Sequence, residues 1–301
     1  MSFMKFKSLV LAIVALTLVM SSAAFAYAPK DQPDKKGILV VSFGTSMPEA
    51  KKAIDNLVNA TKIEFPGTEV RVAYTSNIIR RKIAKEQNVM IPTPAEAIAR
   101  MNDEGFTHLY VTPMHIIPGE EYDDIRNLAE AVATIRGKYG FKVVKVSKPY
   151  LASVSDCEVM ADILANRFKD KLDEEGTAIV LMGHGTPHHI ANAMYSQLQL
   201  ALNKKVPGRF FLGTVEAAPQ IDDVIANLKK DAGIKKLVLS PLMIVAGDHA
   251  NNDLAGEDDP ESWISLLKAE GYDNIETYLV GLGEDSEMAK VFTAKIAELM
   301  K

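Results

Sequence analysis

The sequence contains little of what several common protein classes need. Cys157 is the only cysteine among 301 residues, so the chain can form neither an intramolecular disulfide nor a cysteine-based metal cluster. No stretch is dense in lysine or arginine, and the net charge is −5, which argues against a nucleic-acid partner. Apolar residues make up 48% and charged residues 24%, the balance of a globular protein with a full core.

Three familiar catalytic motifs are also missing. No phosphate-binding loop of the form GxxxxGK[ST] occurs, so we expect no ATP and no other nucleotide cofactor. Gly183-x-Gly185 follows an apolar run, but His188 stands where the dinucleotide fingerprint needs its third glycine. No GxSxG elbow occurs, which argues against an α/β-hydrolase. Any chemistry must therefore come from other residues.

The N-terminus has the pattern of a cleavable export signal. Two lysines precede an apolar run at residues 9–20, and Ala24-Phe25-Ala26 follows as a small-x-small cleavage site. As a helix this run would span ~18 Å, too short for a bilayer core of ~30 Å, although an uncleaved anchor is the alternative. We predict a signal peptide at residues 1–26 and a periplasmic protein that begins near Tyr27. No later run approaches transmembrane length, so no membrane span is expected after cleavage.

Apolar runs typical of buried strands alternate with helical patterns along the rest of the chain. The eight runs lie at residues 38–41, 70–73, 108–112, 143–146, 178–182, 210–213, 237–240 and 275–280. This alternation predicts an α/β fold with parallel sheets and helices on both faces. A polar stretch near residues 148–155 divides the chain, so we predict two similar α/β domains at 37–149 and 150–301.

The two halves resemble each other at three strand ends. Residues 40–46 match 181–187, residues 72–76 match 212–216, and residues 111–121 match 239–249. We interpret this ordered recurrence as a duplication, although apolar strands of unrelated α/β halves also look alike. Two such domains would face each other across a central cleft lined by the carboxyl ends of their strands, where ligands of α/β sheets bind.

The matched strand ends differ in chemistry between the halves. The second half carries two imidazoles and one carboxylate, namely His184, Glu216 and His249. The equivalent positions of the first half are Phe43, Ser76 and Glu121. Two histidines and a carboxylate form a common ligand set for a divalent metal that keeps positions open for substrate or water. We therefore favour a metal site on the second domain.

Each of these residues also has a purely structural interpretation. A histidine at a strand end can simply form hydrogen bonds within a loop, and Glu216 can occupy the first turn of a helix, where the helix dipole favours a carboxylate. His184 and His188 form a competing metal pair four residues apart, but a strand-to-helix turn separates them. We interpret His188 and His189 as residues at the mouth of the cleft, and His115 as structural.

The same segments resemble the anaerobic sirohydrochlorin cobaltochelatases, which belong to the class II tetrapyrrole chelatases. The resemblance runs from about residue 37 to the C-terminus and rests on VSFGTS (41–46), HIIPGEEY (115–122), MGHG (182–185), GTVE (213–216) and AGDHANND (246–253). It implies two Rossmann-like domains with a tetrapyrrole cleft between them. It also implies metal-binding histidines at His184 and His249, and cleft carboxylates at Glu216 and Glu121.

The resemblance implies a reaction that the residues can perform. A divalent metal, cobalt(II) or alternatively iron(II), would enter sirohydrochlorin without ATP while two protons leave. Imidazole suits this task because its pKa of ~6.5 lets it act as a neutral ligand or as a proton acceptor. We expect His184, Glu216 and His249 to bind the metal, and His184, His249 and Glu121 to act in catalysis.

Further residues are candidates for binding the tetrapyrrole. Its rim of carboxylates needs cations, which Arg80 and Arg81 could supply, although both can equally belong to a solvated helix face. Phe43, Ser42 and Thr45 would line the cleft at the first strand end. We expect a homo-oligomer whose partners are sirohydrochlorin and the metal; bound haem is possible but cannot be read from the sequence.

Two other functions fit some of the same features. An exported metal- or tetrapyrrole-binding carrier would also have two α/β lobes and a signal peptide, but it needs no proton acceptors in its cleft. A metal-dependent hydrolase could use the same three ligands. The export signal itself departs from most relatives, which work in the cytoplasm.

Overall fold

The structure is a computed structural model that describes residues 33–301. The signal peptide predicted at residues 1–26 lies outside the described residues. Within the described range, no helix is both long and apolar enough to cross a membrane.

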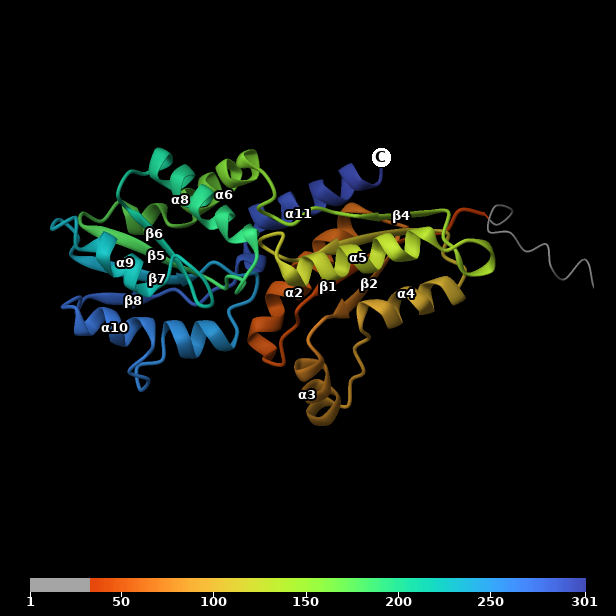
Figure 1. The fold of residues 1–301 in the computed structure, drawn as a ribbon, viewed down its shortest axis with the longest axis horizontal. Helices are drawn as coiled ribbons and strands as arrows, with labels where there is room; N and C mark the ends of the chain where they lie inside the picture. The colour runs from red at the N-terminus through yellow and green to blue at the C-terminus, as the bar shows by residue number, and fades with distance from the viewer. Residues whose placement is uncertain (1–32) are drawn as a thin grey trace, which may run out of the picture.

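The first half folds into a parallel four-stranded sheet with the strand order β2-β1-β3-β4 (Figure 1). Its strands are β1 (Lys36–Ser42), β2 (Glu69–Tyr74), β3 (His108–Pro113) and β4 (Val143–Val146). Its helices are α2 (Pro48–Glu64), α3 (Asn77–Gln87), α4 (Pro94–Asp103), α5 (Glu120–Thr134) and the short 3₁₀ helix η2 (Gly137–Tyr139). Consecutive strands are thus joined by helical crossovers, as parallel pairing requires.

The second half repeats this plan with the strand order β6-β5-β7-β8, again all parallel. Its strands are β5 (Thr177–Gly183), β6 (Phe210–Thr214), β7 (Lys236–Pro241) and β8 (Ile275–Thr277). The helices around it are α6 (Val154–Arg167), α7 (Lys169–Leu172), η3 (Ile190–Asn192), α8 (Ala193–Lys205), α9 (Ile221–Leu228), the π-helix η4 (Ala250–Leu254), α10 (Trp263–Ala269), η5 (Leu282–Glu284) and α11 (Ser286–Leu299). The predicted α/β fold with two similar parallel sheets is confirmed.

The pairing register shows that the sequence repeat is also a structural repeat. Val41 of β1 lies opposite Ala73 of β2, and Met182 of β5 lies opposite Gly213 of β6. In the matched segments, Val41 corresponds to Met182 and Ala73 corresponds to Gly213, so equivalent residues are paired in both sheets. The strand predicted at residues 275–280 is shorter in the structure and ends at Thr277; the Tyr278 amide still donates to the Leu239 carbonyl at 2.8 Å, and the Val280 carbonyl accepts from the Arg167 guanidinium at 2.8 Å.

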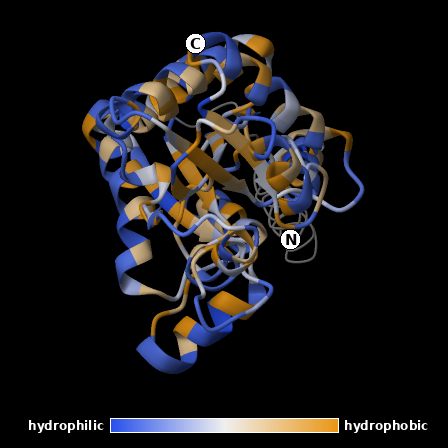
Figure 2. Cartoon of the chain, turned by 90° about the vertical axis from the view of Figure 1, so that its left-hand side faces the viewer, coloured by the Kyte–Doolittle hydropathy of each residue, from blue (hydrophilic) through white to orange (hydrophobic). Residues whose placement is uncertain are grey.

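Apolar side chains place the sheets at the centre of each half. The residues of β5 are all buried, and in β1 only the first residue is exposed. Figure 2 shows strands in apolar colours inside the molecule, surrounded by helices that carry both hydrophilic and hydrophobic residues. Strands buried on both faces need such continuous apolar runs, which is why the sequence predicted them.

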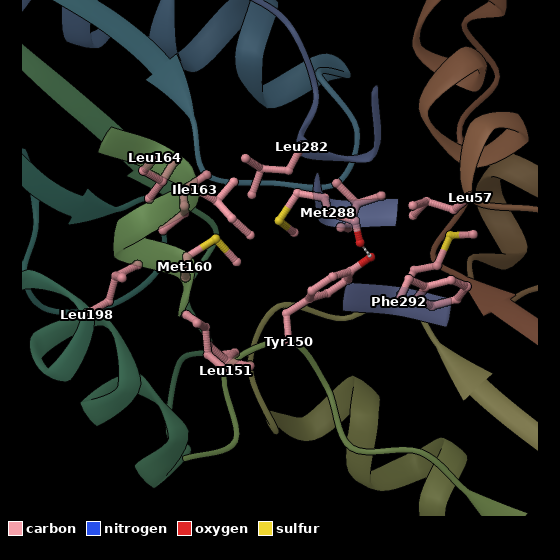
Figure 3. Packing of buried hydrophobic residues seen from close by; sticks show 14 of the residues in the cluster. Leu57, Tyr150, Leu151, Met160, Ile163, Leu164, Leu198, Leu282, Met288 and Phe292 are labelled. Carbon is pink, nitrogen blue, oxygen red and sulfur yellow. Dashed lines mark hydrogen bonds between the residues drawn. The ribbon is translucent and has the colours of Figure 1, made fainter. Parts of the chain in front are cut away.

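The C-terminal helix α11 returns to the first half and packs against α2. The Tyr150 ring stacks on Phe292 with 6.1 Å between centroids, and its hydroxyl donates to the Met288 carbonyl at 3.5 Å (Figure 3). On the same side, the Asn56 amide donates to the Gly283 carbonyl at 2.7 Å. One apolar cluster therefore continues from one half into the other. The predicted domain boundary stays a prediction, and α11 packs across it.

Candidate functional site

The turns at the strand ends repeat in both halves and place the candidate residues. The Ser76 amide donates to the Phe43 carbonyl at 3.2 Å, and the Glu216 amide donates to the His184 carbonyl at 2.9 Å. Each bond joins the turn after a central strand to the turn after its neighbour. The fold therefore holds His184 beside Glu216, as the sequence predicted.

His249 completes this group from the segment after β7. The His184 and His249 rings lie 4.8 Å apart between centroids at an interplanar angle of 83°, and His184 Nδ1 lies 3.6 Å from Glu216 Oε2. About two fifths of each of these three side chains is exposed. The structure thus brings the predicted ligands together. No three potential ligands among residues 33–301 already surround one metal position.

Asp253 orients the His249 ring, and the sequence analysis missed it. Its Oδ2 accepts a hydrogen bond from His249 Nδ1 within the helical turn that continues into η4. Because Nδ1 is engaged, Nε2 is the nitrogen left for a ligand. The spacing of four residues, which puts two side chains on one helix face, was the signal that could have found this pair.

The turn that carries His184 is fixed by buried groups. Gly185 has φ +84°, a conformation that favours glycine, and its amide donates to the Tyr195 hydroxyl at 3.3 Å. Burial raises the pKa of Tyr195 to about 12, so this hydroxyl stays neutral. The His184 Nδ1 lies 3.0 Å from the Gly185 carbonyl oxygen. These contacts leave His184 Nε2 as the nitrogen free for a ligand.

Glu121 of the first half sits in the first turn of α5, with neighbours that favour its ionised form. Thr75 Oγ1 donates to Glu121 Oε2 at 2.9 Å, and His115 Nε2 lies 3.9 Å from the same oxygen. His115 contributes most to holding the pKa of Glu121 below its usual range; the Thr75 bond and the nearby His184 act in the same direction, against desolvation. Glu121 is thus a carboxylate of the first half whose pKa is affected by His184 of the second half.

The two halves touch beside this carboxylate. His189 Nε2 lies 3.2 Å from Asp123 Oδ2 of α5, and His189 Nδ1 accepts from the Ala191 amide at 3.1 Å. Since Nδ1 accepts, Nε2 is the nitrogen that donates to Asp123. A Cβ on Gly119 would lie 3.3 Å from a methyl carbon of Thr186, which shows how closely these segments approach. His189 therefore joins the halves, whereas His188 is exposed.

The residues predicted at the first strand end have different surroundings. Phe43 is 49% exposed and can offer an apolar face to a ligand. Ser42 and Thr45 are buried. Their hydroxyls accept from the Gly44 amide at 3.2 Å and the Met47 amide at 3.1 Å, respectively. Both hydroxyls therefore shape the turn that presents Phe43.

The two predicted arginines also differ. Arg80 donates to the Ile91 carbonyl at 2.8 Å, to Asn77 Oδ1 at 2.9 Å and to Glu96 Oε2 at 2.8 Å. Its guanidinium thereby links α3 to α4, and a substrate carboxylate would have to compete with Glu96. Arg81 is exposed on the same helix. Sequence alone could not separate these neighbours, because both lie in one basic stretch.

Comparison with known proteins identifies relatives over most of the chain. Residues 36–301 match the family model described as cobalt chelatase (CbiK). The chain is 36% identical over 242 residues to the sirohydrochlorin cobaltochelatase CbiKC of Nitratidesulfovibrio vulgaris (strain Hildenborough), covering 79% of this chain and 81% of that protein. It is 32% identical over 268 residues to the sirohydrochlorin cobaltochelatase of Salmonella typhimurium, covering 88% and 97% of the two chains.

Solved structures support the fold. SirB from Bacillus subtilis with Fe³⁺ superposes with a TM-score of 0.61 at 18% identity, covering 88% of this chain and 95% of that chain. CbiX, described as the terminal enzyme for biosynthesis of sirohaem in denitrifying bacteria, gives 0.55 at 15% identity, covering 88% and 100%. Together with the family match over nearly all described residues, these findings establish that the chain belongs to the cobalt chelatase (CbiK) family.

Proposed function

We propose that this chain inserts a divalent metal into sirohydrochlorin without ATP, releasing two protons per metal. The names of its relatives support the tetrapyrrole and favour cobalt(II), with iron(II) as the alternative. The observation that carries the proposal is the grouping of His184, Glu216 and His249 on one half, with the Glu121 carboxylate of the other half close enough to His184 for its pKa to be lowered.

The second half would hold the incoming metal as substrate. Two neutral imidazoles and one carboxylate suit cobalt(II), iron(II) and related ions, and they leave positions open for the pyrrole nitrogens. His184, Glu216 and His249 do not surround one position as they lie among residues 33–301, so binding one ion requires these partly exposed side chains to rotate. A site assembled in this way binds the ion without enclosing it, which suits an ion that must be passed on.

The first half would receive the pyrrole protons and the macrocycle. Each pyrrole N–H bond breaks as a nitrogen binds the metal, and Glu121 is a carboxylate placed to accept that proton. The exposed Phe43 ring can pack on the face of the macrocycle, and Arg81 can pair with a peripheral carboxylate. The cleft is thus polar on both sides but asymmetric: metal ligands on one half, a proton acceptor on the other.

An absorption time course tests this function. Sirohydrochlorin in large excess over protein is mixed with cobalt(II), without ATP, and compared with an identical reaction containing iron(II). We expect product well beyond one equivalent per protein. A spectral shift that stops at one equivalent would instead indicate a carrier, and no change at all would refute the assignment.

We also propose that the protein is exported and forms a homo-oligomer. The pattern of residues 1–26 supports export, and we expect the mature chain to begin near Tyr27 in the periplasm. Mass spectrometry of protein from the native host checks this, and an intact N-terminus would contradict it. Light scattering of the purified protein checks the oligomer, and a monomeric mass would contradict that part.

A further inference from the structure

His115 is a largely buried imidazole to which the proposed reaction assigns no role. It lies just beyond β3, where its carbonyl accepts from the Tyr150 amide at 3.1 Å and so fixes the loop. Only 15% of its side chain is exposed. Both ring nitrogens are buried and form no hydrogen bond with any described residue.

An unpaired buried imidazole is costly and therefore needs an explanation. Leaving a buried polar group without a partner is unfavourable, and such groups in native proteins often have a functional role. The nearest partner is Glu121 Oε2, 3.9 Å from His115 Nε2 and too far for a direct hydrogen bond. Because half of the Glu121 side chain is exposed, a small rotation can close this gap.

Glu121 thus has two sides with different functions. Its Oε2 faces the first half, where Thr75 Oγ1 donates to it and His115 lies behind it. Among the described residues, Glu121 is the carboxylate that lies beside His115, and His184 of the other half also helps to hold the pKa of Glu121 below its usual range. A proton that reaches the carboxylate from the cleft can therefore move on to the imidazole.

We propose that His115 acts through Glu121 as a second proton store, so that the pair takes up both protons that metal insertion releases. This inference rests on the proposed function. It assigns His115 a positioning and proton-carrying role, since Glu121 is the group that meets the substrate. Two stored protons match the two N–H bonds that one divalent metal replaces.

The proton steps balance. The first pyrrole N–H breaks as an O–H forms on Glu121; that O–H then breaks as an N–H forms on neutral His115, which restores the carboxylate and creates imidazolium. The second pyrrole proton then stays on Glu121. After the product leaves, Glu121 releases its proton to water and becomes a carboxylate again. The imidazolium of His115 then transfers its proton to Glu121, which releases this second proton to water as well. No oxidant or other reactant is needed.

A substitution that keeps hydrogen bonding but removes the proton acceptor tests the role. His115→Gln should lower kcat for cobalt insertion by about tenfold to a hundredfold, within the range of a lost acid–base group. The KM for sirohydrochlorin and the cobalt affinity measured by calorimetry should stay within about threefold of wild type. The matched control is His108→Gln, because His108 lies at the opposite end of β3 and is similarly buried, beside Thr107. It should keep the wild-type kcat.

Counting protons in a single turnover provides a second readout, which compares wild type with His115→Gln. Protein in excess is mixed with sirohydrochlorin and cobalt(II) in weak buffer. The absorption of the product and the colour of a pH indicator are recorded together over time. Wild type should release both protons after the product band appears, whereas His115→Gln should release one of them together with it.

Two outcomes would overturn the inference: wild type releasing both protons in step with insertion, or His115→Gln with an unchanged kcat. If wild type inserts no metal at all, the proposed function itself fails, which is a distinguishable result.

Discussion

Removing the carboxylate that holds His249 should weaken metal binding without unfolding the protein. In Asp253→Ala, the His249 ring loses the acceptor for Nδ1, so the ring can rotate and Nε2 is no longer held in one orientation. Losing such a partner of a metal ligand typically costs tenfold to a hundredfold in affinity, or about 1.4–2.8 kcal/mol. Since both side chains are 40% exposed, their pairing contributes at most about 1 kcal/mol to folding.

Calorimetry with cobalt(II) and protein alone measures this effect, with thermal unfolding as the check on folding. Asp253→Asn should fall between wild type and Asp253→Ala, because an amide oxygen still accepts from Nδ1 but without the charge. The matched control is Asp248→Asn, an exposed carboxylate beside His249 that is bonded to Asn252. The reasoning fails if Asp253→Ala binds cobalt as wild type does, or if Asp248→Asn loses as much affinity.

Three other substitutions test the site. His184→Ala should abolish cobalt insertion while thermal unfolding stays near wild type, since the ring is partly exposed; near-normal turnover would exclude it as a ligand. Glu216→Gln should weaken cobalt binding. Glu121→Gln should instead slow turnover while its affinity for cobalt stays within about threefold of wild type, a difference of ~0.7 kcal/mol. The reverse pattern would show that the two carboxylates have each other's role. Gly185→Ala should destabilise the fold by about 1–3 kcal/mol in denaturant titrations because of its positive φ, and an unchanged midpoint would contradict this.

The sequence could predict most of the candidate site because the site follows from the topology. Parallel strands end at one edge of a sheet, so residues that directly follow β5 and β6 must be neighbours there. That argument was enough to group His184 with Glu216, and the repeat placed His249 and Glu121 at equivalent positions. The geometry agrees: the two imidazole rings are in contact distance.

Other properties depend on neighbours that are distant in sequence. The sequence does not distinguish Arg80 from Arg81. In the structure, Glu96 and the Ile91 carbonyl bind the Arg80 guanidinium, whereas Arg81 is exposed. The path of α11 likewise depends on the apolar surface that α2 offers it.

The sequence by itself determined the alternating strands, the duplication and the residue types at the strand ends, because burial and pairing impose short-range patterns. Only the tertiary structure decided which of those residues are free to act. It brought the unpartnered His115 ring behind Glu121, across a gap of 3.9 Å. The physical reason is that hydrogen bonding, burial and charge at a site are set by contacts between segments, and no single segment encodes them.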